Sequence, residues 1–518
     1  MSSFLLQGPV AVIGAGTMGI GIAQVAAAAG HNVLLFDVNV EASTRALTTL
    51  QQRLRQRVEA GKADANDTEQ LLERIQVVTA LSELAPCALA IEAIAERLDV
   101  KQSLFRDLEA ICSQQTLFAS NTSSLSITAI ASALKHPQRM AGLHFFNPAP
   151  VMKLVEIVRG LETTQATLNL LQQLAVAWKK QPVICRSAPG FIVNRVARPF
   201  YAETLRALEE QVASPATLDA ALRDAGGFAM GPLQLTDLIG QDVNYAVTES
   251  VFRAFGHDPR FQPSLVQQEL VNAGHLGRKS GRGFYRYDSS SIQESPAFSC
   301  IENGSLPQRI TAHGCWSSLP HFAALLQQNG IAIEEQKESA ESAPFLRLDE
   351  VTFMLSKGKL SSEVAEEMRT PVVQFDLSAN YQQASVITIS AASCNTAAQT
   401  ALVIRFLQSL GKNVIVLPDY PALLTLRTVA MLCNEALDAL NKGIASAADL
   451  DLAMCRGVNY PLGPLAWGQQ LGWQHILATL ENLNAFYAEP RYRPTSLLRQ
   501  LAAGYVSLSF SATQDLIP

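Results

Sequence analysis

A glycine-rich loop between two short apolar runs constrains this chain more than any other feature of its sequence. The run Val10–Ile13 leads directly into Gly14-Ala-Gly-Thr-Met-Gly19, and an alanine-rich stretch from Met18 to Ala29 follows. A second apolar run, 32–36, then ends on Asp37. Short apolar runs indicate strands buried on both faces, and the alanine-rich stretch indicates a helix. The order of strand, loop, helix, strand and acid is typical of a dinucleotide-binding unit.

Each part of this unit has a physical task. Gly14 permits the tight turn, Gly16 lets the backbone approach a pyrophosphate, and Gly19 lets the helix pack closely on the strand. The helix begins near Thr17 and Met18, where free N–H groups and the positive end of the helix dipole attract phosphate. The same loop without a ligand would be a simple tight turn, but the complete context favours a bound dinucleotide.

Asp37 indicates which dinucleotide binds. Its carboxylate can accept hydrogen bonds from the ribose hydroxyls, and its negative charge repels the 2′-phosphate of NADP. We therefore expect NAD as the cofactor. The glycine fingerprint alone leaves FAD open as an alternative.

Polar side chains follow the later strands of this unit. Apolar runs at 77–78, 88–91, 116–119 and 140–145 alternate with helix-like stretches, which predicts a doubly wound, mostly parallel sheet. Ligands bind beyond the carboxyl ends of the strands in such sheets. The residues that follow these strands are therefore candidates for contacts with the nicotinamide and the substrate: Glu96, Lys101, Ser120–Ser124 and His144–Pro148.

His144 and Glu156 form the strongest catalytic candidate. Met152–Val158 is expected to be a strand, and its period of two places Glu156 on one face with Leu154 and Val158. A carboxylate on an apolar face is costly unless it is paired, and the short intervening turn makes His144 a suitable partner. A carboxylate behind an imidazole fixes its tautomer and stabilises the imidazolium. Beside a dinucleotide, the pair fits alcohol oxidation, with His144 taking the hydroxyl proton.

Six ordered motifs resemble those of the 3-hydroxyacyl-CoA dehydrogenases. They are Gly14–Gly19, Ser120–Ser124, Gly142–Pro148, Met152–Glu156, Pro189–Arg195 and Leu276–Tyr285, so the resemblance covers residues 8–287. It implies an α/β Rossmann-like N-terminal domain, an all-α C-terminal domain, and NAD-dependent oxidation of an acyl-CoA thioester. With segments 232–242 and 489–494 included, the chain looks most like the branch of this family that oxidises 3-hydroxyadipyl-CoA in bacterial phenylacetate catabolism.

The resemblance also implies a role for each site residue. His144 would be the base, and Glu156 would be its partner. Ser123 and Asn194 would contact the substrate oxygen, and Asn147 would support the site. No metal is implied. The positions implied to contact the cofactor are Gly14, Gly16, Thr17, Met18, Gly19, Asp37, Glu96, Lys101 and Asn121.

A helical insertion between Glu41 and Arg74 departs from the family pattern. The family's lysine that contacts CoA corresponds here to Leu54, so CoA anchoring is expected to rest on other residues, such as the flanking arginines. The cations of this insertion have two equally supported interpretations, a solvated basic face and a contact with an anionic substrate tail. They are Arg53, Arg55, Arg57 and Lys62.

The chain contains an internal repeat. A shift of 232 residues continues without a gap and superposes Pro189 on Pro421, Arg195 on Arg427, Glu203 on Glu435 and Gly240 on Gly472. Both copies are expected to be helical and to bury a shared face. In the second copy Leu426 replaces Asn194 and cannot bond a substrate oxygen. We predict a degenerate, structural copy and a single active site in residues 1–290.

Between the two copies, the sequence predicts a small α/β piece. Strand-like runs at 386–389 and 414–416 flank a helix that extends through Leu407, which suggests a decayed relic of the first domain. We therefore predict four parts: an NAD-binding domain (1–185), a helical substrate and dimerisation domain (186–289), a small α/β linker region (290–415) and a degenerate helical domain (416–518).

Composition limits the kind of partner and compartment. The 518 residues carry a formal charge of -6, which disfavours nucleic acid and anionic lipid as main partners. The eight cysteines contain no C-x-x-C pair, and no apolar run approaches the ~20 residues of a membrane helix. We expect a cytoplasmic protein, either a homo-oligomer (dimer or trimer) or a monomer with an internal pseudo-dimer.

Alternative functions remain open at this stage. A 3-hydroxybutyryl-CoA dehydrogenase of fatty-acid or butanoate metabolism fits the same motifs. A non-catalytic NAD-binding structural protein is the alternative from another class, although His144, Glu156, Ser123 and Asn194 are all present. If the acyl group is dicarboxylic, its distal carboxylate needs a cation, for which Arg195 and Arg198 are the candidates.

Overall fold

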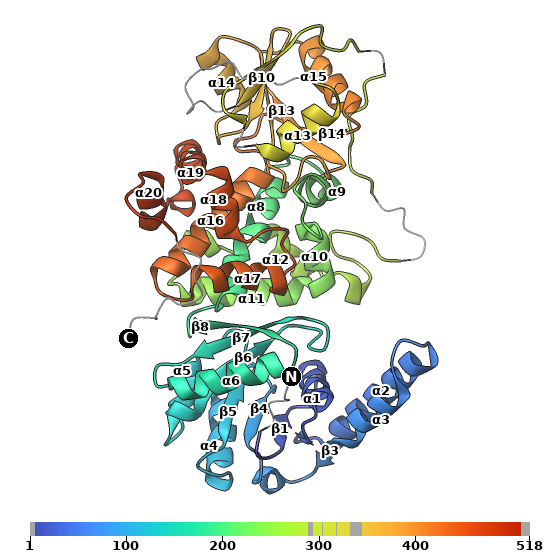
Figure 1. Ribbon diagram of the computed structural model, residues 1–518, viewed down its shortest axis with the longest axis vertical. Helices are drawn as coiled ribbons and strands as arrows, with labels where there is room; N and C mark the ends of the chain where they lie inside the picture. The colour runs from blue at the N-terminus through green and yellow to red at the C-terminus, as the bar shows by residue number, and fades with distance from the viewer. Residues whose placement is uncertain (1–5, 289–293, 303, 317–318, 332–343, 509–518) are drawn as a thin grey trace. The chain divides into compact units, whose positions relative to one another are not determined.

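The computed structural model describes residues 6–288, 294–302, 304–316, 319–331 and 344–508 (Figure 1). Two compact units are present, and each is described by itself. The first contains residues 1–194 and 442–458, and the second contains residues 195–441 and 459–509. The start of the predicted linker region, 290–293, and residues 509–518 of the predicted degenerate domain lie outside the described residues.

An eight-stranded sheet forms the centre of the first unit. Its order is β3-β2-β1-β4-β5-β6-β7-β8, and all neighbours run parallel except β6 and β7. The doubly wound, mostly parallel sheet that the apolar runs predict is confirmed. The strands are β1 (Val10–Ile13), β2 (Val33–Phe36), β3 (Ile75–Val78), β4 (Leu89–Glu92), β5 (Leu117–Ser120), β6 (Met140–Phe145), β7 (Leu154–Arg159) and β8 (Gln181–Arg186).

Helices cover this sheet and form its predicted insertion. The insertion consists of two helices, each begun by a side-chain cap: Asn39 accepts from the Ala42 N–H, and Asp64 accepts from the Asp67 N–H. The helices of this part are α1 (Thr17–Ala28), α2 (Val40–Glu59), α3 (Ala65–Glu73), α4 (Leu98–Ile111), α5 (Ile127–Ala131) and α6 (Gln165–Ala177), followed by α7 (Val193–Val196).

One helix of the second copy belongs to the first unit. Helix α17 (Ala447–Gly457) packs against β7 and β8, which α6 also contacts. The approach is close, because a Cβ on Gly457 would lie 2.6 Å from the Leu154 side chain. The N–H of Arg186 donates to the Ile444 carbonyl and ties this segment to the end of β8.

The second unit holds the remaining helices of both copies. Helix α16 is buried almost all round and packs on α8, α18 and α19. Buried ion pairs join the copies: Arg195 donates to Glu435 and Asp438, both at 2.6 Å. The helices are α8 (Arg198–Glu209), α9 (Pro215–Ala220), α10 (Pro232–Ile239), α11 (Gln241–Ala254), α12 (Leu265–Asn272), α16 (Thr425–Asn441), α18 (Pro464–Leu471), α19 (Trp473–Tyr487) and α20 (Ser496–Ala502).

A six-stranded sheet completes the second unit and is larger than the sequence predicts. Its order is β14-β13-β12-β11-β10-β9, with helices α13 (Pro320–Gln328), α14 (Ser361–Met368) and α15 (Ala397–Ser409) beside it (Figure 1). Only its last two strands and α15 are predicted. The strands are β9 (Ile310–His313), β10 (Phe345–Leu348), β11 (Val351–Leu355), β12 (Val372–Phe375), β13 (Val386–Ala391) and β14 (Asn413–Leu417).

The 232-residue shift extends into this second sheet. It carries β7 onto β13 and α6 onto α15 with identical limits, and it carries the start of β8 onto the start of β14. The strand directions agree as well, because β12–β13 is antiparallel and β13–β14 is parallel, as in β6–β7 and β7–β8. The second sheet therefore repeats the end of the first one.

Candidate active site

The glycine loop has the geometry that its three glycines predict. Gly14 has φ +102°, and a Cβ there would lie 2.5 Å from the Ala93 carbonyl oxygen. A Cβ on Gly19 would lie 1.8 Å from the Gly14 carbonyl oxygen, so the helix could not pack as closely. Gly16 faces open space, with no heavy atom within 4 Å of the Cβ position. The loop thus leaves room for a phosphate beside the first turn of α1, whose N–H groups lack partners within the helix.

Asp37 lies where β2 ends and is fixed by the backbone. One carboxylate oxygen accepts from the Ala15 N–H at 2.8 Å, and the other accepts from the Asn39 N–H at 2.9 Å. Each oxygen keeps a lone pair for a ribose hydroxyl. The next residue, Val38, is 92% exposed.

Lys101 lies at the centre of a buried ion cluster. Its Nζ donates to both oxygens of Glu92, at 2.8 and 2.7 Å, and lies 3.3 Å from a Glu96 oxygen. Ser120 also donates to Glu92. Because Lys101 is only 1% exposed and its three donors have acceptors nearby, it can act on a cofactor only through Glu96. Glu92, a carboxylate at the end of a buried strand, is a member of this cluster that sequence reasoning missed.

Glu96 holds the loop that follows β5. Its Oε1 accepts from Thr122 Oγ1 at 2.6 Å, from the Ser123 N–H at 3.0 Å and from Ser124 Oγ at 2.9 Å. Burial alone would raise the pKa of Glu96, but these hydrogen bonds and the charge of Lys101 hold it below its ordinary value. A charged Glu96 therefore sets the position of Ser123.

His144 and Glu156 form the predicted pair. They face each other across the antiparallel strands β6 and β7, and His144 Nδ1 lies 2.6 Å from Glu156 Oε2. The other oxygen, Oε1, accepts from the N–H groups of Ile192 and Val193 at 3.0 and 2.9 Å. Glu156 is completely buried and His144 is 6% exposed. The carboxylate thus holds both the imidazole and the start of α7, and His144 Nε2 stays free of that pair.

Four further residues are predicted beside this pair, and three of them take part in hydrogen bonds there. Asn194 Nδ2 donates to the Ser123 carbonyl at 3.4 Å, so the two residues implied to bind the substrate oxygen lie together. Asn121 Oδ1 accepts from the Phe145 N–H at 2.8 Å and fixes the end of β6. Asn147 is exposed and makes no side-chain hydrogen bond with any described residue.

The insertion gives a different account of position 54 from the one that the resemblance implies. Leu54 is buried in the hydrophobic core of the first unit, so this position does not face a ligand. A lost CoA contact at Leu54 therefore does not follow. Two of the flanking arginines already have partners: Arg53 donates to Gln24 at 2.7 Å, and Arg55 pairs with Glu69 at 3.1 Å.

Comparison with known families agrees with this geometry. The model of the 3-hydroxyacyl-CoA dehydrogenase NAD-binding domain matches residues 9–188, and that of the C-terminal domain matches residues 190–287 and 424–505. A 3-hydroxyadipyl-CoA dehydrogenase from Escherichia coli is 51% identical over 501 residues, covering 96% of this chain and 98% of that protein. The chain belongs to the 3-hydroxyacyl-CoA dehydrogenase family.

Other relatives are similar over all or half of the chain. The crystal structure of a 3-hydroxybutyryl-CoA dehydrogenase from Escherichia coli has a TM-score of 0.87 and 51% identity, covering 97% of this chain and all of that one. A probable 3-hydroxybutyryl-CoA dehydrogenase from Bacillus subtilis is 41% identical over 282 residues, 54% of this chain and 98% of that protein. Shorter relatives thus correspond to the first half alone.

Family membership settles the general chemistry and the organisation of the fold. This 3-hydroxyacyl-CoA dehydrogenase is an NAD-dependent oxidoreductase with a Rossmann-like domain followed by two helical copies. The model of a reduced Rossmann-fold domain matches residues 353–421, which confirms the predicted relic between the copies. Over the part of the chain that the structure describes, every helix is too short or too polar to span a membrane.

Proposed function

We propose that this enzyme oxidises 3-hydroxyadipyl-CoA to the 3-oxoacyl-CoA in phenylacetate catabolism, with NAD as the oxidant. The 51% identity over nearly the full length to a 3-hydroxyadipyl-CoA dehydrogenase supports the dicarboxylic acyl group. The buried contact between His144 and Glu156 is the observation that carries the chemistry.

His144 is the general base in this proposal. NAD, when bound, supplies the acceptor for the hydride that leaves the C3 carbon. Glu156 accepts a hydrogen bond from the Nδ1–H of His144, which leaves Nε2 as the acceptor for the hydroxyl proton. The same carboxylate then faces the imidazolium at 2.6 Å and stabilises its charge without moving, because the Ile192 and Val193 N–H groups hold its other oxygen.

The neighbouring polar residues orient the two reactants. Asn194 and Ser123, which lie together, hydrogen-bond the substrate oxygen, and Asn147 contributes from the exposed turn after β6. Asn121 acts through the backbone of Phe145, next to the base. Asp37 receives the ribose hydroxyls, and the loop at Gly14, Gly16, Thr17, Met18 and Gly19 receives the pyrophosphate. Glu96 contacts the cofactor, and Lys101 acts on it only through Glu96.

The substrate assignment is tested by comparing two thioesters. We expect a clearly higher kcat/KM with 3-hydroxyadipyl-CoA than with 3-hydroxybutyryl-CoA, measured by NADH formation under identical conditions. The second candidate is 3-hydroxybutyryl-CoA oxidation, which the similarity to a 3-hydroxybutyryl-CoA dehydrogenase of known structure favours. A preference for the monocarboxylic thioester would remove the phenylacetate assignment and leave the dehydrogenase chemistry intact.

The second helical copy has a structural role in this proposal. It takes the place of part of the contact that shorter relatives would make between chains, with Leu426 in the position of Asn194. The four domain limits given above belong to the same proposal, as does a cytoplasmic location, which the eight free cysteines support. Deletion of residues 416–518 should abolish folding and activity, and a folded, active, unchanged assembly would contradict this role.

A further inference from the structure

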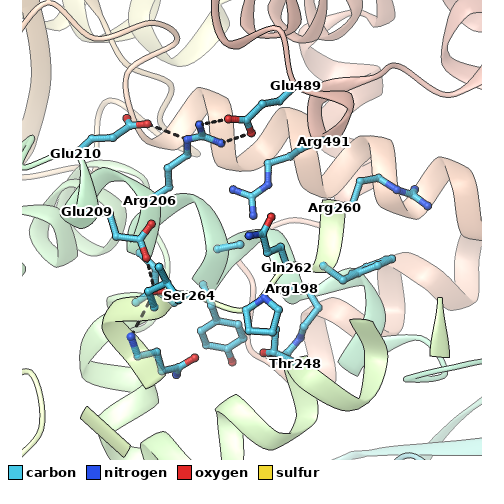
Figure 2. Close-up of a pocket in the computed structure, with 17 residues that line it drawn as sticks. Arg198, Arg206, Glu209, Glu210, Thr248, Arg260, Gln262, Ser264, Glu489 and Arg491 are labelled. Atoms are coloured by element: carbon cyan, nitrogen blue, oxygen red, sulfur yellow. Dashed lines mark hydrogen bonds and ion pairs between the residues drawn. The ribbon is translucent and has the colours of Figure 1, made fainter. Parts of the chain in front are cut away.

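A cavity of about 230 Å³ lies among the helices of the second unit (Figure 2). Every residue that lines it belongs to that unit. Its lining contains both apolar and charged residues. The apolar residues are Ala202, Leu205, Phe261, Pro263 and Leu265. The charged residues are the arginines Arg198, Arg206, Arg260 and Arg491 and the glutamates Glu209, Glu210 and Glu489.

Two of the four arginines are neutralised within the protein. Both outer nitrogens of Arg206 donate to Glu489 at 2.7 Å, and its Nε donates to Glu210 at 2.8 Å. Arg260 pairs with Asp258 at 3.0 Å and with Glu435 at 2.9 Å. These two cations are therefore part of the scaffold.

Arg198 differs, because none of the described carboxylates pairs with it. It is 4% exposed, donates one hydrogen bond to Thr248 Oγ1 at 2.9 Å and lies over the Tyr201 ring. Its Nε is buried without an acceptor. Burial lowers the pKa of the Arg198 guanidinium, in keeping with a charge that is desolvated but not compensated.

Arg491 is a second cation of the lining; besides the hydrogen bonds of Arg206, its charge helps to lower the pKa of Glu489, but no hydrogen bond joins the two described side chains. It is 9% exposed, and the structure gives its guanidinium no hydrogen bond or ion pair with any described residue. Figure 2 shows it pointing toward the middle of the cavity, near Gln262. Both oxygens of the nearby Glu489 are already bonded to Arg206. The remaining carboxylate of the lining, Glu209, accepts from Ser264 Oγ at 2.6 Å.

We infer that this cavity is a binding site for a carboxylate carried on a short hydrocarbon chain. The planar fork of a guanidinium matches a carboxylate with two parallel hydrogen bonds, and the apolar residues of the lining accommodate methylene groups. Arg195, the other sequence candidate for a distal carboxylate, is excluded because it already donates to Glu435 and Asp438. Of these two candidates, Arg198 is therefore the one that can receive an external anion, with Arg491 as a second cation of the same cavity.

The carboxylate can come from two sources. One is the distal end of a dicarboxylic acyl chain, and this source rests on the proposed function. The other is a free short-chain carboxylate from solution. The charge and burial of the cavity are the same in both cases, so the experiment separates them.

The test uses the full-length protein with Arg198→Gln, Arg491→Gln and the control Arg253→Gln, an exposed arginine paired with Glu249. Isothermal titration with sodium adipate should show binding that weakens about 10- to 100-fold in each cavity variant and is unchanged in the control. The neutral isostere adipamide should not bind. If Arg198→Gln does not fold, the affinity of Arg491→Gln for adipate tests the site instead.

Steady-state kinetics identify the source. If the substrate supplies the anion, Arg198→Gln lowers kcat/KM for 3-hydroxyadipyl-CoA about 10- to 100-fold and leaves 3-hydroxyhexanoyl-CoA unaffected. Loss of adipate binding without a change in that ratio identifies a free carboxylate. Folded variants that change neither quantity overturn the site. If the wild type does not prefer the dicarboxylic thioester but variant-sensitive adipate binding persists, the proposed substrate fails and the cavity stands.

Discussion

The ends of the two sheets place different residues on the same framework. In the first, His144 and Glu156 face each other across β6 and β7. The 232-residue shift carries them to Asp376, directly after β12, and to Thr388 in β13, and the Asp376 N–H donates to the Thr388 carbonyl at 2.9 Å. The backbone arrangement survives, but neither side chain of the catalytic pair does.

The second framework keeps one of the two tasks that Glu156 performs. Asp376 accepts from the N–H groups of Leu424 and Thr425 at 2.9 and 2.7 Å, and these are the counterparts of Ile192 and Val193. A carboxylate therefore still holds the turn that begins the helical copy. It belongs, however, to the residue at the position of His144 and not to the residue at the position of Glu156. Both copies thus keep a carboxylate that holds this turn, whereas only the first has a histidine that can accept a proton.

The two halves also exchange helices. Residues 221–225 of the first helical copy pack on β13, and α17, which contains their counterpart, packs on β7. Each sheet end is thus covered by a helix from the other half, which is the reciprocal contact of a two-fold dimer built into one chain. The second half keeps this packing contact, and in the proposal it has no base of its own.

The largest expected effect comes from removing the imidazole of the first site. His144→Gln should lower kcat about 10²- to 10⁴-fold, because it removes the proposed general base. Binding of NADH should be unchanged. Steady-state rates and NADH fluorescence titration measure the two quantities.

The matched control is a partly buried histidine of the second half. His475 Nε2 lies 2.9 Å from the Ser356 carbonyl oxygen, and burial lowers its pKa to about 4. His475→Gln should leave kcat per folded enzyme unchanged. Equal losses in both variants, or full turnover in His144→Gln, would contradict the assignment of one active site to the first half.

The reciprocal ion pairs between the copies provide the next largest effect. Glu435 accepts from Arg195 at 2.6 Å and from Arg260 at 2.9 Å, whereas its counterpart Glu203 lies 3.9 Å from Arg427. Glu435→Gln should cost about 3–5 kcal/mol of unfolding free energy, because two buried guanidinium groups lose a charged partner. Glu203→Gln should cost less. Urea denaturation measures both, and equal costs would show that the copies contribute symmetrically.

Sequence periodicity predicts the parts of this comparison that depend on local pattern. The limits of β1 and β6 follow from apolar runs, and β13, α15 and β14 are found where expected. Strands β9 to β12 are missed because they lie in a polar region. A signal was present: Leu346 and Leu348, then Val351, Phe353 and Leu355, alternate on either side of a two-residue turn and are all buried.

The site is predictable where its partners are close in the chain. His144 and Glu156 are twelve residues apart on neighbouring strands, so period-two alternation brings them together. The two candidate arginines show the opposite case. Arg195 is taken by Glu435, 240 residues away, while Arg198 has no carboxylate among the described residues, and nothing local distinguishes them. Leu54 likewise shows that a motif position does not give the face of a helix.

A smaller effect is expected from the carboxylate of the second framework. Asp376→Asn replaces one acceptor oxygen by an NH₂ group, which then faces N–H donors of the turn at 424–426. Unfolding free energy should fall by about 1–3 kcal/mol, the usual cost of leaving buried donors without acceptors. Because this turn belongs to the half without a base, kcat per folded enzyme should not change. A loss of kcat at unchanged stability would mean that the second framework still serves the reaction.

The smallest expected effect concerns Asp37, which follows β2 near the other edge of the first sheet. The described residues of the second sheet contain no counterpart of β1, α1 and β2, and Asp37 is the residue proposed to select the dinucleotide. Asp37→Ser removes the carboxylate that accepts from Ala15 and Asn39 and that would repel a 2′-phosphate. The ratio of kcat/KM for NAD to that for NADP should fall about tenfold or more, a change of roughly 1.4 kcal/mol. The loss should lie mainly in a higher KM for NAD, since Asp37 contacts no reacting atom. A serine variant that keeps the full preference for NAD over NADP would show that another residue recognises the ribose.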